Sequence, residues 1–525
     1  MRSTFMGLEA NKRGLFTQQS ALYTTGHNIA NANTVGYSRQ RVNMEPTLGY
    51  PGMGLNAPKT PGFIGTGVQA GSVQRIRDEF IDRQFRQETN KLGYYESRAK
   101  AIAQMEDVMS EPSEYGLDEA FRMFWSSLQD VSANPEDIAA RKVAIQRAVH
   151  LADSFNYIDT QLKQIQGNLG NEIDVSITHI NSILEQIADL NRQIQAVEPN
   201  GYVPNDLYDK RDILVDELNE YLPVSIQRVP SGGNSSDVAE GSYTITLKPE
   251  GKDPIILVHG REFAKLSTMG TNGAAIDGND TDNLLDYVRV DWTGSATTDV
   301  SMVNGNLPTG DQLKQSHFEP GKGKLLSLID SYGYVNATDN EGYYPEMLKA
   351  LDDLAETFKT KFNEQHALGY TLTTDTHTSQ AGQNFFEGTT AATIKVVDDI
   401  INNPHYLAAS DASDEEGNGQ NALDLADLQS TPLGELDGGT FQSYYQGLIG
   451  QLGVDGQKAN QLRTNSETIR LTVENNRASM SSVSLDEEMT DMIRFQQAYN
   501  ANARMITVID ETLDKIINGM GRVGL

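Results

Sequence analysis

The sequence predicts a multidomain, mainly α-helical protein with an inserted all-β domain. Three observations lead to this fold class. Both ends of the 525-residue chain carry heptad patterns of apolar residues, residues 138–197 form one long helical pattern, and residues 224–318 read as short strands between Gly, Asn and Asp clusters. We therefore expect terminal coiled-coil helices, an elongated helical-bundle middle domain and a β-rich domain.

The N-terminal heptad pattern predicts a helix over residues 3–31. An apolar residue recurs at every seventh position, at Leu8, Leu15, Leu22 and Ile29. The second apolar position of each heptad holds Lys, Gln or Gly, so this helix would be marginal in isolation. It needs a partner helix.

The C-terminal segment 485–520 supplies the candidate partner. Alternating steps of four and three residues pass through a mostly apolar seam, whose main members are Leu485, Met489, Met492, Tyr499, Ile506, Leu513 and Ile517. At about 1.5 Å per residue this helix spans ~54 Å and the N-terminal helix ~43 Å, so the two can lie alongside each other. The pattern alone leaves open whether they are two ordinary helices of a globular core.

Between the termini the chain is nested. A Pro- and Gly-rich loop or hairpin at 46–67 is followed by helical patterns at 73–110, 117–132, 138–197 and 205–221, the last with Asn205 or Asp206 as its N-cap. After the strands, helices resume at 322–330, 345–366, 420–430 and 440–483. We predict a terminal coiled-coil domain (1–45 and 485–525), a helical middle domain (46–222 and 319–484) and a β-rich domain (223–318), with the termini and the β-rich domain at opposite ends.

Composition excludes several function classes. The net charge of −30 and the pI near 4.6 disfavour electrostatic binding to the phosphate backbone of a nucleic acid, so we expect no nucleic-acid partner. The absence of cysteine rules out disulfides and thiolate metal sites. We find neither a signal peptide pattern nor an apolar run of the ~18 residues needed to span a membrane, which by itself predicts a cytoplasmic protein unless export uses another route.

No motif supports catalysis or a cofactor. "GTGVQA" (65–70) matches the dinucleotide fingerprint but lacks a buried strand before it. The eight histidines are scattered, and His366 reads as a surface or capping residue. The acidic runs at 277–283 and 411–419 lack the spacing of calcium loops. We predict no enzyme activity, metal or cofactor, although a secreted hydrolase or an adhesin carried by the middle region stays an alternative.

The segment "HNIANANTVGYSRQR" (27–41) interrupts the N-terminal helix with three asparagines, which favour caps and turns over helix interiors. We predict that Asn28, Asn31 and Asn33 offer side-chain amides to free backbone carbonyls. Thr34 and Gly36 allow a reversal, and "YSRQRVNM" begins a strand. The segment is therefore expected to be a hinge, and its substitution is expected to impair assembly more than folding.

This segment resembles the N-terminal motif shared by bacterial flagellar axial proteins, and its "GYSRQ" ending is closest to the hook-filament junction proteins among them. Four further blocks are similar to that family in the same order: "GVQAGSVQRIRDEFIDRQFRQE" (67–88), "NDLYDKRDILVDELNEYLPVSI" (205–226), "NFFEGT" (384–389) and "SLDEEMTDMIRFQQAYNANARMITVIDETLDKIIN" (484–518). Val35 departs from the proline often found in the family. A hook or rod-type axial protein is the alternative within this class.

The resemblance implies a structural role at the hook-filament junction. It implies self-assembly through paired terminal helices that line a tube, with the β-rich domain outermost. Implied partners are further copies of the chain, hook protein, hook-associated protein 3 and a flagellar export chaperone. Export would use the flagellar type III apparatus without a cleaved signal. The assembly motif would comprise Asn28, Ile29, Asn31, Asn33, Thr34, Gly36 and Tyr37, and the chaperone would bind Met489, Met492, Tyr499, Ile506 and Leu513.

Overall fold

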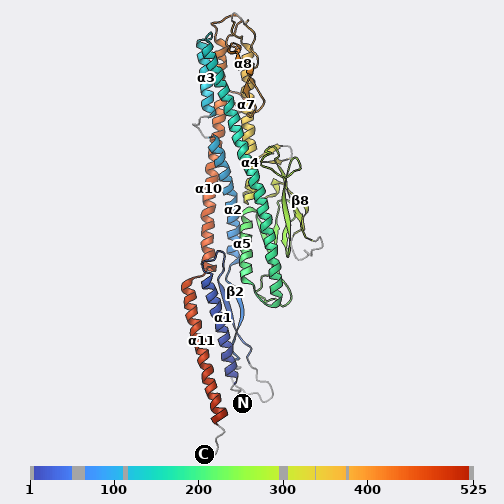
Figure 1. Cartoon of the computed structure of the whole chain (residues 1–525), viewed down its shortest axis with the longest axis vertical. Coiled ribbons are helices and arrows are strands. Elements are labelled where there is room, and N and C mark those ends of the chain that lie inside the picture. The colour runs from blue at the N-terminus through green and yellow to red at the C-terminus, as the bar shows by residue number, and fades with distance from the viewer. Residues whose placement is uncertain are drawn as a thin grey trace, which may run out of the picture.

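A computed structural model describes residues 5–49, 65–109, 116–294, 305–336, 339–373 and 378–519. The molecule is elongated, and both termini lie at the same end (Figure 1). The first and last α-helices of the chain occupy that end, longer helices continue toward the other end, and a β-sheet lies against their flank. The predicted fold class is confirmed.

The terminal end contains two helices and a hairpin. Helix α1 (Phe5–Ala30) lies along α11 (Leu485–Asp514), which continues as a π-helical turn over Lys515–Gly519. Strands β1 (Gln40–Pro46) and β2 (Val68–Arg75) pair antiparallel beside α1. Residues 50–64 of the predicted Pro- and Gly-rich loop lie outside the described residues. Both predicted terminal helices are present.

The shaft of the molecule, called the rod below, is built from four helices: α2 (Glu79–Met109), α4 (Ile138–Val197), α5 (Asn205–Tyr221) and α10 (Phe441–Ser481). The prediction for 138–197 is confirmed at both ends, and the Asp137 side chain caps α4 by accepting from the Ala139 N–H. The helix predicted from residue 73 begins only at Glu79, because 68–75 pairs with β1. Asn205 is the first residue of α5 rather than its cap, which is Pro204.

The sheet has the strand order β10-β9-β7-β6-β5-β4-β3, with β8 paired to β7. Its strands are β3 (Val224–Val229), β4 (Ser242–Leu247), β5 (Ile255–His259), β6 (Glu262–Gly270), β7 (Leu285–Trp292), β8 (Thr309–Leu313), β9 (Tyr334–Asn336) and β10 (Asp339–Glu341). The last two strands lie beyond the predicted β segment 224–318.

The expectation that the β-rich domain lies opposite the termini is wrong. The sheet flanks α4 part of the way along the molecule (Figure 1). The reason is that α5 has 17 residues against 60 in α4. At 1.5 Å per residue, a chain returning along α4 has covered only about 26 Å of ~90 Å when β3 begins.

The far end is formed by α3 (Leu117–Ala133), α7 (Tyr343–Leu368), α8 (Asp398–Asn402), α9 (Gln420–Asp427) and the short strands β11 (Phe386–Glu387) and β12 (Lys395–Val396). The core there is aromatic: Phe358 contacts the rings of Phe121, Phe124 and Trp125 at centroid distances of 5.3, 6.2 and 5.9 Å. Edge-to-face ring contacts of this kind stabilise the core beyond the contribution of its buried apolar area.

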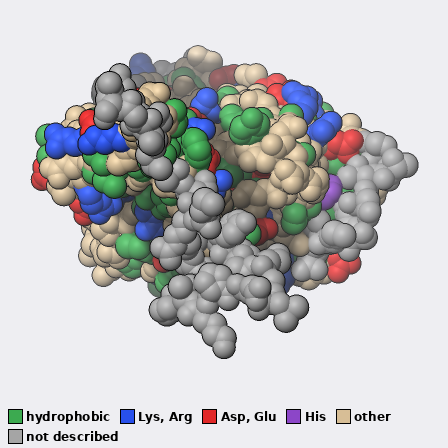
Figure 2. Space-filling model, turned by 90° about the horizontal axis from the view of Figure 1, so that it is seen from below, with side chains coloured by type: hydrophobic (Ala, Val, Ile, Leu, Met, Phe, Trp, Pro, Cys, Tyr) green, Lys and Arg blue, Asp and Glu red, His purple; other side chains and the backbone are tan. Residues whose placement is uncertain are grey.

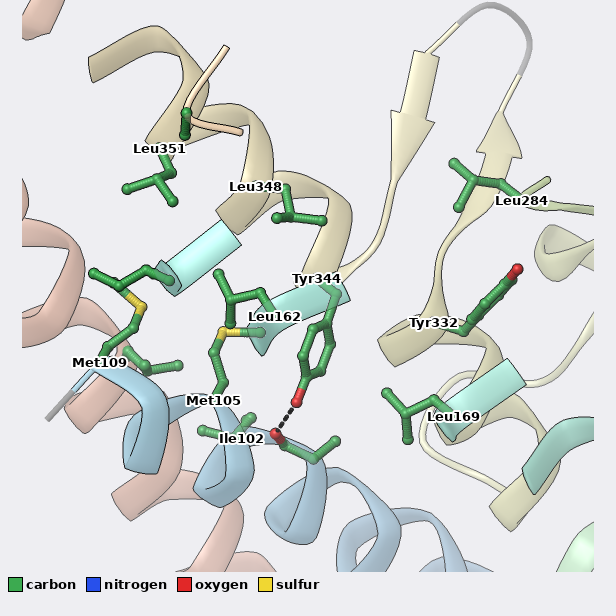
Figure 3. Packing of buried hydrophobic residues seen from close by; sticks show 14 of the residues in the cluster. Ile102, Met105, Met109, Leu162, Leu169, Leu284, Tyr332, Tyr344, Leu348 and Leu351 are labelled. Atoms are coloured by element: carbon green, nitrogen blue, oxygen red, sulfur yellow. Dashed lines mark hydrogen bonds between the residues drawn. The ribbon is translucent and has the colours of Figure 1, made fainter. Parts of the chain in front are cut away.

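Nearer the sheet, α2, α4, α6 (Lys324–Tyr332) and α7 pack side chains into one continuous core (Figure 3). Ile102 and Met105 of α2 meet Leu162 of α4 there. The Tyr344 hydroxyl donates to the Ala101 carbonyl at 3.0 Å, which satisfies its buried polar atom. The rod is therefore a packed unit from base to tip.

The prediction that His366 is a surface or capping residue is wrong. Its ring is fully buried at the end of α7. Nε2 accepts from the Ala408 N–H at 2.9 Å, so Nδ1 carries the proton and donates to the Gln383 carbonyl at 2.6 Å. The neutral ring thus joins two loop segments to the helix.

Candidate assembly site at the base of the rod

Asn28 is the centre of the hinge that follows α1. Its side chain is 1% exposed. Nδ2 donates to the Gln40 carbonyl at 2.8 Å and to Oε2 of Glu488 at 3.0 Å, while Oδ1 accepts from the Gln40 N–H and the Tyr37 hydroxyl. One amide thereby joins the end of α1, the start of β1 and the first turn of α11.

The other asparagines of the motif differ in their roles. Asn31 donates to the His27 carbonyl at 3.0 Å, which closes the last turn of α1. Asn33 is exposed, and no hydrogen bond of its side chain is found within the described residues. The Thr34 hydroxyl donates to Oδ1 of Asn31 at 3.3 Å, and Ile29 is half-buried. The motif is thus held mainly by Asn28 and Asn31.

Gly36 is where the chain reverses toward β1. Its φ of +76° lies in the left-handed region. A Cβ at this position would lie 2.4 Å from two carbon atoms of Ile213, on α5. The hinge therefore requires glycine for both its backbone and its contact with the rod.

Tyr37 and His27 complete the hinge. The Tyr37 hydroxyl donates to Asn28 at 2.8 Å and lies 2.9 Å from Nδ1 of His27. Burial raises the pKa of Tyr37, so the phenol stays protonated. The bond to Asn28 uses the phenol's only proton, which makes Nδ1 of His27 the donor in the second bond.

Beside the hinge lies a buried network of arginines and carboxylates between the hairpin and α5. Asp209 accepts from the Ser38 N–H at 3.0 Å and the Ser38 hydroxyl at 2.7 Å. Arg75, at the end of β2, contacts Asp209 at 2.6 Å, Asp212 at 2.9 Å and Glu240 at 2.6 Å. One guanidinium therefore ties the hairpin to the rod and to the β-rich domain.

Asp212 is the most enclosed acid of this network. Its carboxylate contacts Arg77 at 2.8 Å and Arg86 at 3.3 Å as well as Arg75. Burial alone raises the pKa of Asp212, but the arginines, with Arg211, outweigh burial and hold the pKa well below its usual range. The carboxylate is charged at neutral pH.

Two further arginines extend the network to the C-terminal helices. Arg477, near the end of α10, contacts Asp82 at 2.8 Å and Asp216 at 2.7 Å. Arg39 contacts Glu487 at 2.5 Å and Glu488 at 2.6 Å on α11, and its N–H donates to the Ser481 carbonyl. The turn between α10 and α11 is therefore fixed against the hinge.

Sequence reasoning missed this network, although one signal was present. Asp209, Asp212 and Asp216 follow the helical spacing of three and four, which places three carboxylates on one face of α5. Their arginine partners come from the block 67–88 and from α10. The network therefore unites two of the blocks that carry the family resemblance.

The terminal seam lies differently from its prediction. Leu8, Leu15 and Leu22 are only half-buried. The buried residues of α1 are small or polar: Gly14, Thr17, Ala21, Thr25 and Asn28. Three of them, Gly14, Ala21 and Asn28, lie one position before Leu15, Leu22 and Ile29 of the predicted seam. A Cβ on Gly14 would lie 3.0 Å from Asn502, so α1 and α11 approach closely at this point.

On α11 the predicted seam divides between two environments. Met492, Tyr499, Ile506 and Leu513 are half-buried or buried, whereas Leu485, Met489 and Ile517 are exposed. Other large apolar side chains of the pair are also exposed, including Tyr23 at 71% and Val508 at 50%. Figure 2 shows hydrophobic side chains among charged ones on the end that carries the termini.

Two kinds of feature are absent from the described ranges. None of their helices is both long and apolar enough to cross a membrane. The same residues contain no group of three His, Asp or Glu side chains arranged to hold a metal ion.

Comparisons with known proteins agree on one family. The family model described as flagellar hook-associated protein FlgK helical domain matches residues 102–386. The model for the flagellar basal body rod FlgEFG protein C-terminal region matches 475–519, and that for flagella basal body rod protein matches 8–37. The terminal regions thus match rod-type models and the middle matches a junction-protein model.

Curated relatives match over almost the whole chain. Flagellar hook-associated protein 1 of Bacillus subtilis (strain 168) is 41% identical over 533 residues, which cover 99% of each chain. The protein of the same name from Escherichia coli (strain K12) is 29% identical, covering 96% of this chain and 98% of the relative.

A solved structure supports the fold. The flagellar hook junction protein FlgK from Burkholderia pseudomallei aligns with a TM-score of 0.54 at 15% identity, covering 77% of this chain and 100% of that one.

Proposed function

The chain belongs to the family of flagellar hook-associated protein 1, and from this premise we propose that it assembles by packing the α1/α11 pair against further copies. It is a structural component of the flagellum with a role at the hook-filament junction, and it is not an enzyme. Its partners are other flagellar axial proteins. The predicted domain boundaries and the residues that make the assembly contacts are part of the proposal.

The observation that carries the proposal is the distribution of apolar side chains on the terminal pair. The buried residues of α1 are small or polar, while large apolar residues of the pair such as Tyr23, Met489 and Val508 stay exposed. Exposed apolar surface of this extent is typical of an interaction site. Copies that pack side by side would bury it.

For specific neighbours, we propose hook protein on one side of the assembly and hook-associated protein 3 on the other. We further propose export through the flagellar type III apparatus without a cleaved signal peptide, aided by a flagellar export chaperone on α11. Of the proposed chaperone contacts, only Met489 is freely exposed, whereas Met492, Tyr499 and Ile506 are half-buried and Leu513 is buried, on a helix that packs along α1. Chaperone binding would therefore compete with α1 for the same face of α11.

The test is complementation of a deletion strain. Without the protein we expect hooks that lack filaments and flagellin shed into the medium. The variants Tyr23→Ser and Val508→Ser should be secreted at normal levels but should restore few filaments, because their side chains are exposed in the single subunit. Val175→Ser, at an exposed position on α4, is the matched control and should restore filaments. Full complementation by both terminal variants would contradict the proposal.

A further inference from the structure

A cavity of about 310 Å³ lies between α1, β1 and α11. One wall is formed by Ala21, Thr24 and Thr25 of α1, and the second by Arg39 and the first residues of β1, as far as Met44. The third wall belongs to α11 and consists of Glu488, Asp491, Arg494 and Phe495. A water molecule takes about 30 Å³ in the liquid, so the cavity is far larger than a packing defect. It opens next to the hinge, on the terminal pair itself.

Two exposed apolar side chains occupy the same level of α11 on another face. Met489 is 58% exposed and Ile493 is 53% exposed. At 3.6 residues per turn these two residues lie about 40° apart around the helix axis, and their mean direction is about 150° from that of Asp491 and Arg494. The cavity and the two apolar side chains therefore lie on nearly opposite flanks of one helix.

The charges on the two flanks are complementary. Arg41, which lines the cavity, and Asp486, three residues before Met489, are both exposed, and within the described residues neither is in an ion pair. Helical spacing places Asp486 on the flank of Met489 and Ile493. The other charged side chains of the cavity lining, Arg39, Glu488, Asp491 and Arg494, are paired with one another. A carboxylate beside two apolar side chains thus matches the one lining arginine whose charge is unpaired within the described residues, Arg41.

Surfaces that differ but complement each other on opposite sides of one subunit form head-to-tail contacts, which close into rings or extend as helices. We propose that the cavity between α1, β1 and α11 receives Met489 and Ile493 of a second copy, with Asp486 of that copy paired to Arg41. This inference rests on the proposed packing of the terminal pair, and it names the residues that determine the direction of packing.

Charge reversal tests the pairing. Arg41→Glu and Asp486→Lys should each lower the number of filaments per cell about tenfold, because like charges would face each other at the contact. The double variant Arg41→Glu with Asp486→Lys should restore filaments, since every subunit carries both halves of the contact. A double variant no better than the single variants would overturn the inference. Circular dichroism of the purified single variants should match that of the unsubstituted chain.

Crosslinking tests the identity of the occupant. The chain has no cysteine, so Arg41→Cys with Asp486→Cys introduces the only two thiols of each subunit. In isolated hook-filament junctions, mild oxidation should give a ladder of multiples of the subunit mass. Each single cysteine variant, and Arg41→Cys paired with Val175→Cys, should give none. Monomer only, or an adduct with another axial protein, would overturn the inference.

These outcomes are separable from failure of the proposed function. If Tyr23→Ser and Val508→Ser abolish filaments while the double charge reversal does not rescue, the terminal pair assembles but through another register. If all of these variants complement fully, the proposed function itself fails.

Discussion

The Asn28 side chain donates to the Glu488 carboxylate at 3.0 Å, although 460 positions separate the two residues in the sequence. This bond lies inside the hinge, and Glu488 is itself 2% exposed. Arg39 supplies the positive charge that Glu488 needs, at 2.6 Å. The direction in which α11 leaves the rod is therefore set by residues of the last turn of α1 and of the segment that follows it.

We predict that Asn28→Ala loosens the start of α11. The substitution leaves the Gln40 N–H and carbonyl and the Tyr37 hydroxyl short of a partner, at a cost of about 1–3 kcal/mol for a buried unsatisfied group. Hydrogen exchange should accelerate in residues 485–495 and stay unchanged in α4. Asn33→Ala, at an exposed position of the same motif, is the control and should leave both segments unchanged. Equal exchange in the two variants would refute the role of Asn28.

Gly36→Val should impair assembly more than it unfolds the rod. The left-handed backbone costs an L-residue roughly 1–2 kcal/mol, and the added Cβ collides with Ile213. The hinge must therefore move away from α5. Filament counts should fall while the circular dichroism of the purified chain is preserved. Adding Ile213→Ala should recover part of the loss by removing the collision but not the backbone strain, and full filaments from Gly36→Val alone would contradict the prediction.

Acid should weaken the base of the rod through Asp212. Because the pKa of Asp212 is lower in the folded state than in the unfolded state, the carboxylate contributes stability above the unfolded pKa of about 3.9. That contribution is lost as pH falls below this value. Asp212→Asn should lower the free energy of unfolding at pH 7 by about 3–5 kcal/mol, because the buried arginines lose the carboxylate that they share. In urea unfolding, the difference between the two chains should shrink below about pH 4, and a constant difference would show that Asp212 is not the titrating group.

Much of the secondary structure could be predicted, because it is written in local periodicity. The 60 residues of α4 and the strands after Val224 follow from their spacing alone. Two features did not follow. The buried side of α1 contains Gly14 and Ala21, because small side chains allow neighbouring elements to approach closely. The heptad pattern instead predicts that the leucines are buried. The contact of Arg75 with Asp209 joins positions 134 residues apart, and no local pattern reports such a pairing.

The position of the β-rich domain was missed for a related reason. The order of elements along the chain indicates nesting. The place of the β-rich domain along the rod, however, depends on how far α5 returns along α4 before the first strand begins. His366 shows the same limit at the scale of one residue, because its two hydrogen-bond partners lie on loops from elsewhere in the sequence.

The tip of the rod should lose stability in mildly acidic solution because of His366. Burial, together with the nearby charge of Arg141, lowers the pKa of His366 to about 4 from the ordinary value of 6.5. Between these values the unfolded chain binds a proton that the folded chain does not, so stability falls as pH falls from 6.5 to 4, by up to about 3 kcal/mol. With Trp292→Phe in the background, Trp125 is the sole tryptophan and reports on the tip core.

His366→Gln is the control for this effect. Its amide can replace the acceptor for the Ala408 N–H without titrating. Urea unfolding at pH 7 and pH 5 should differ clearly for the chain with His366 and little for the Gln variant. The same pH dependence in both chains would assign it to another group.

One methyl group on α4 should loosen the loop of the β-rich domain that packs against this helix. Gly167 faces the loop between β6 and β7 so closely that a Cβ would lie 2.2 Å from the Gly278 carbonyl oxygen, and a backbone atom cannot move aside as a side-chain end can. Gly167→Ala should therefore cost about 1–3 kcal/mol through overpacking, despite the better helix propensity of alanine. Gly450→Ala on α10 is the matched control, because no atom lies within 4 Å of its added Cβ. The free energy of unfolding of the control variant should rise by up to about 1 kcal/mol, because alanine favours a helix over glycine. Hydrogen exchange in residues 270–283 should accelerate in Gly167→Ala alone, and equal exchange in the two variants would mean that the loop is held by contacts other than this one.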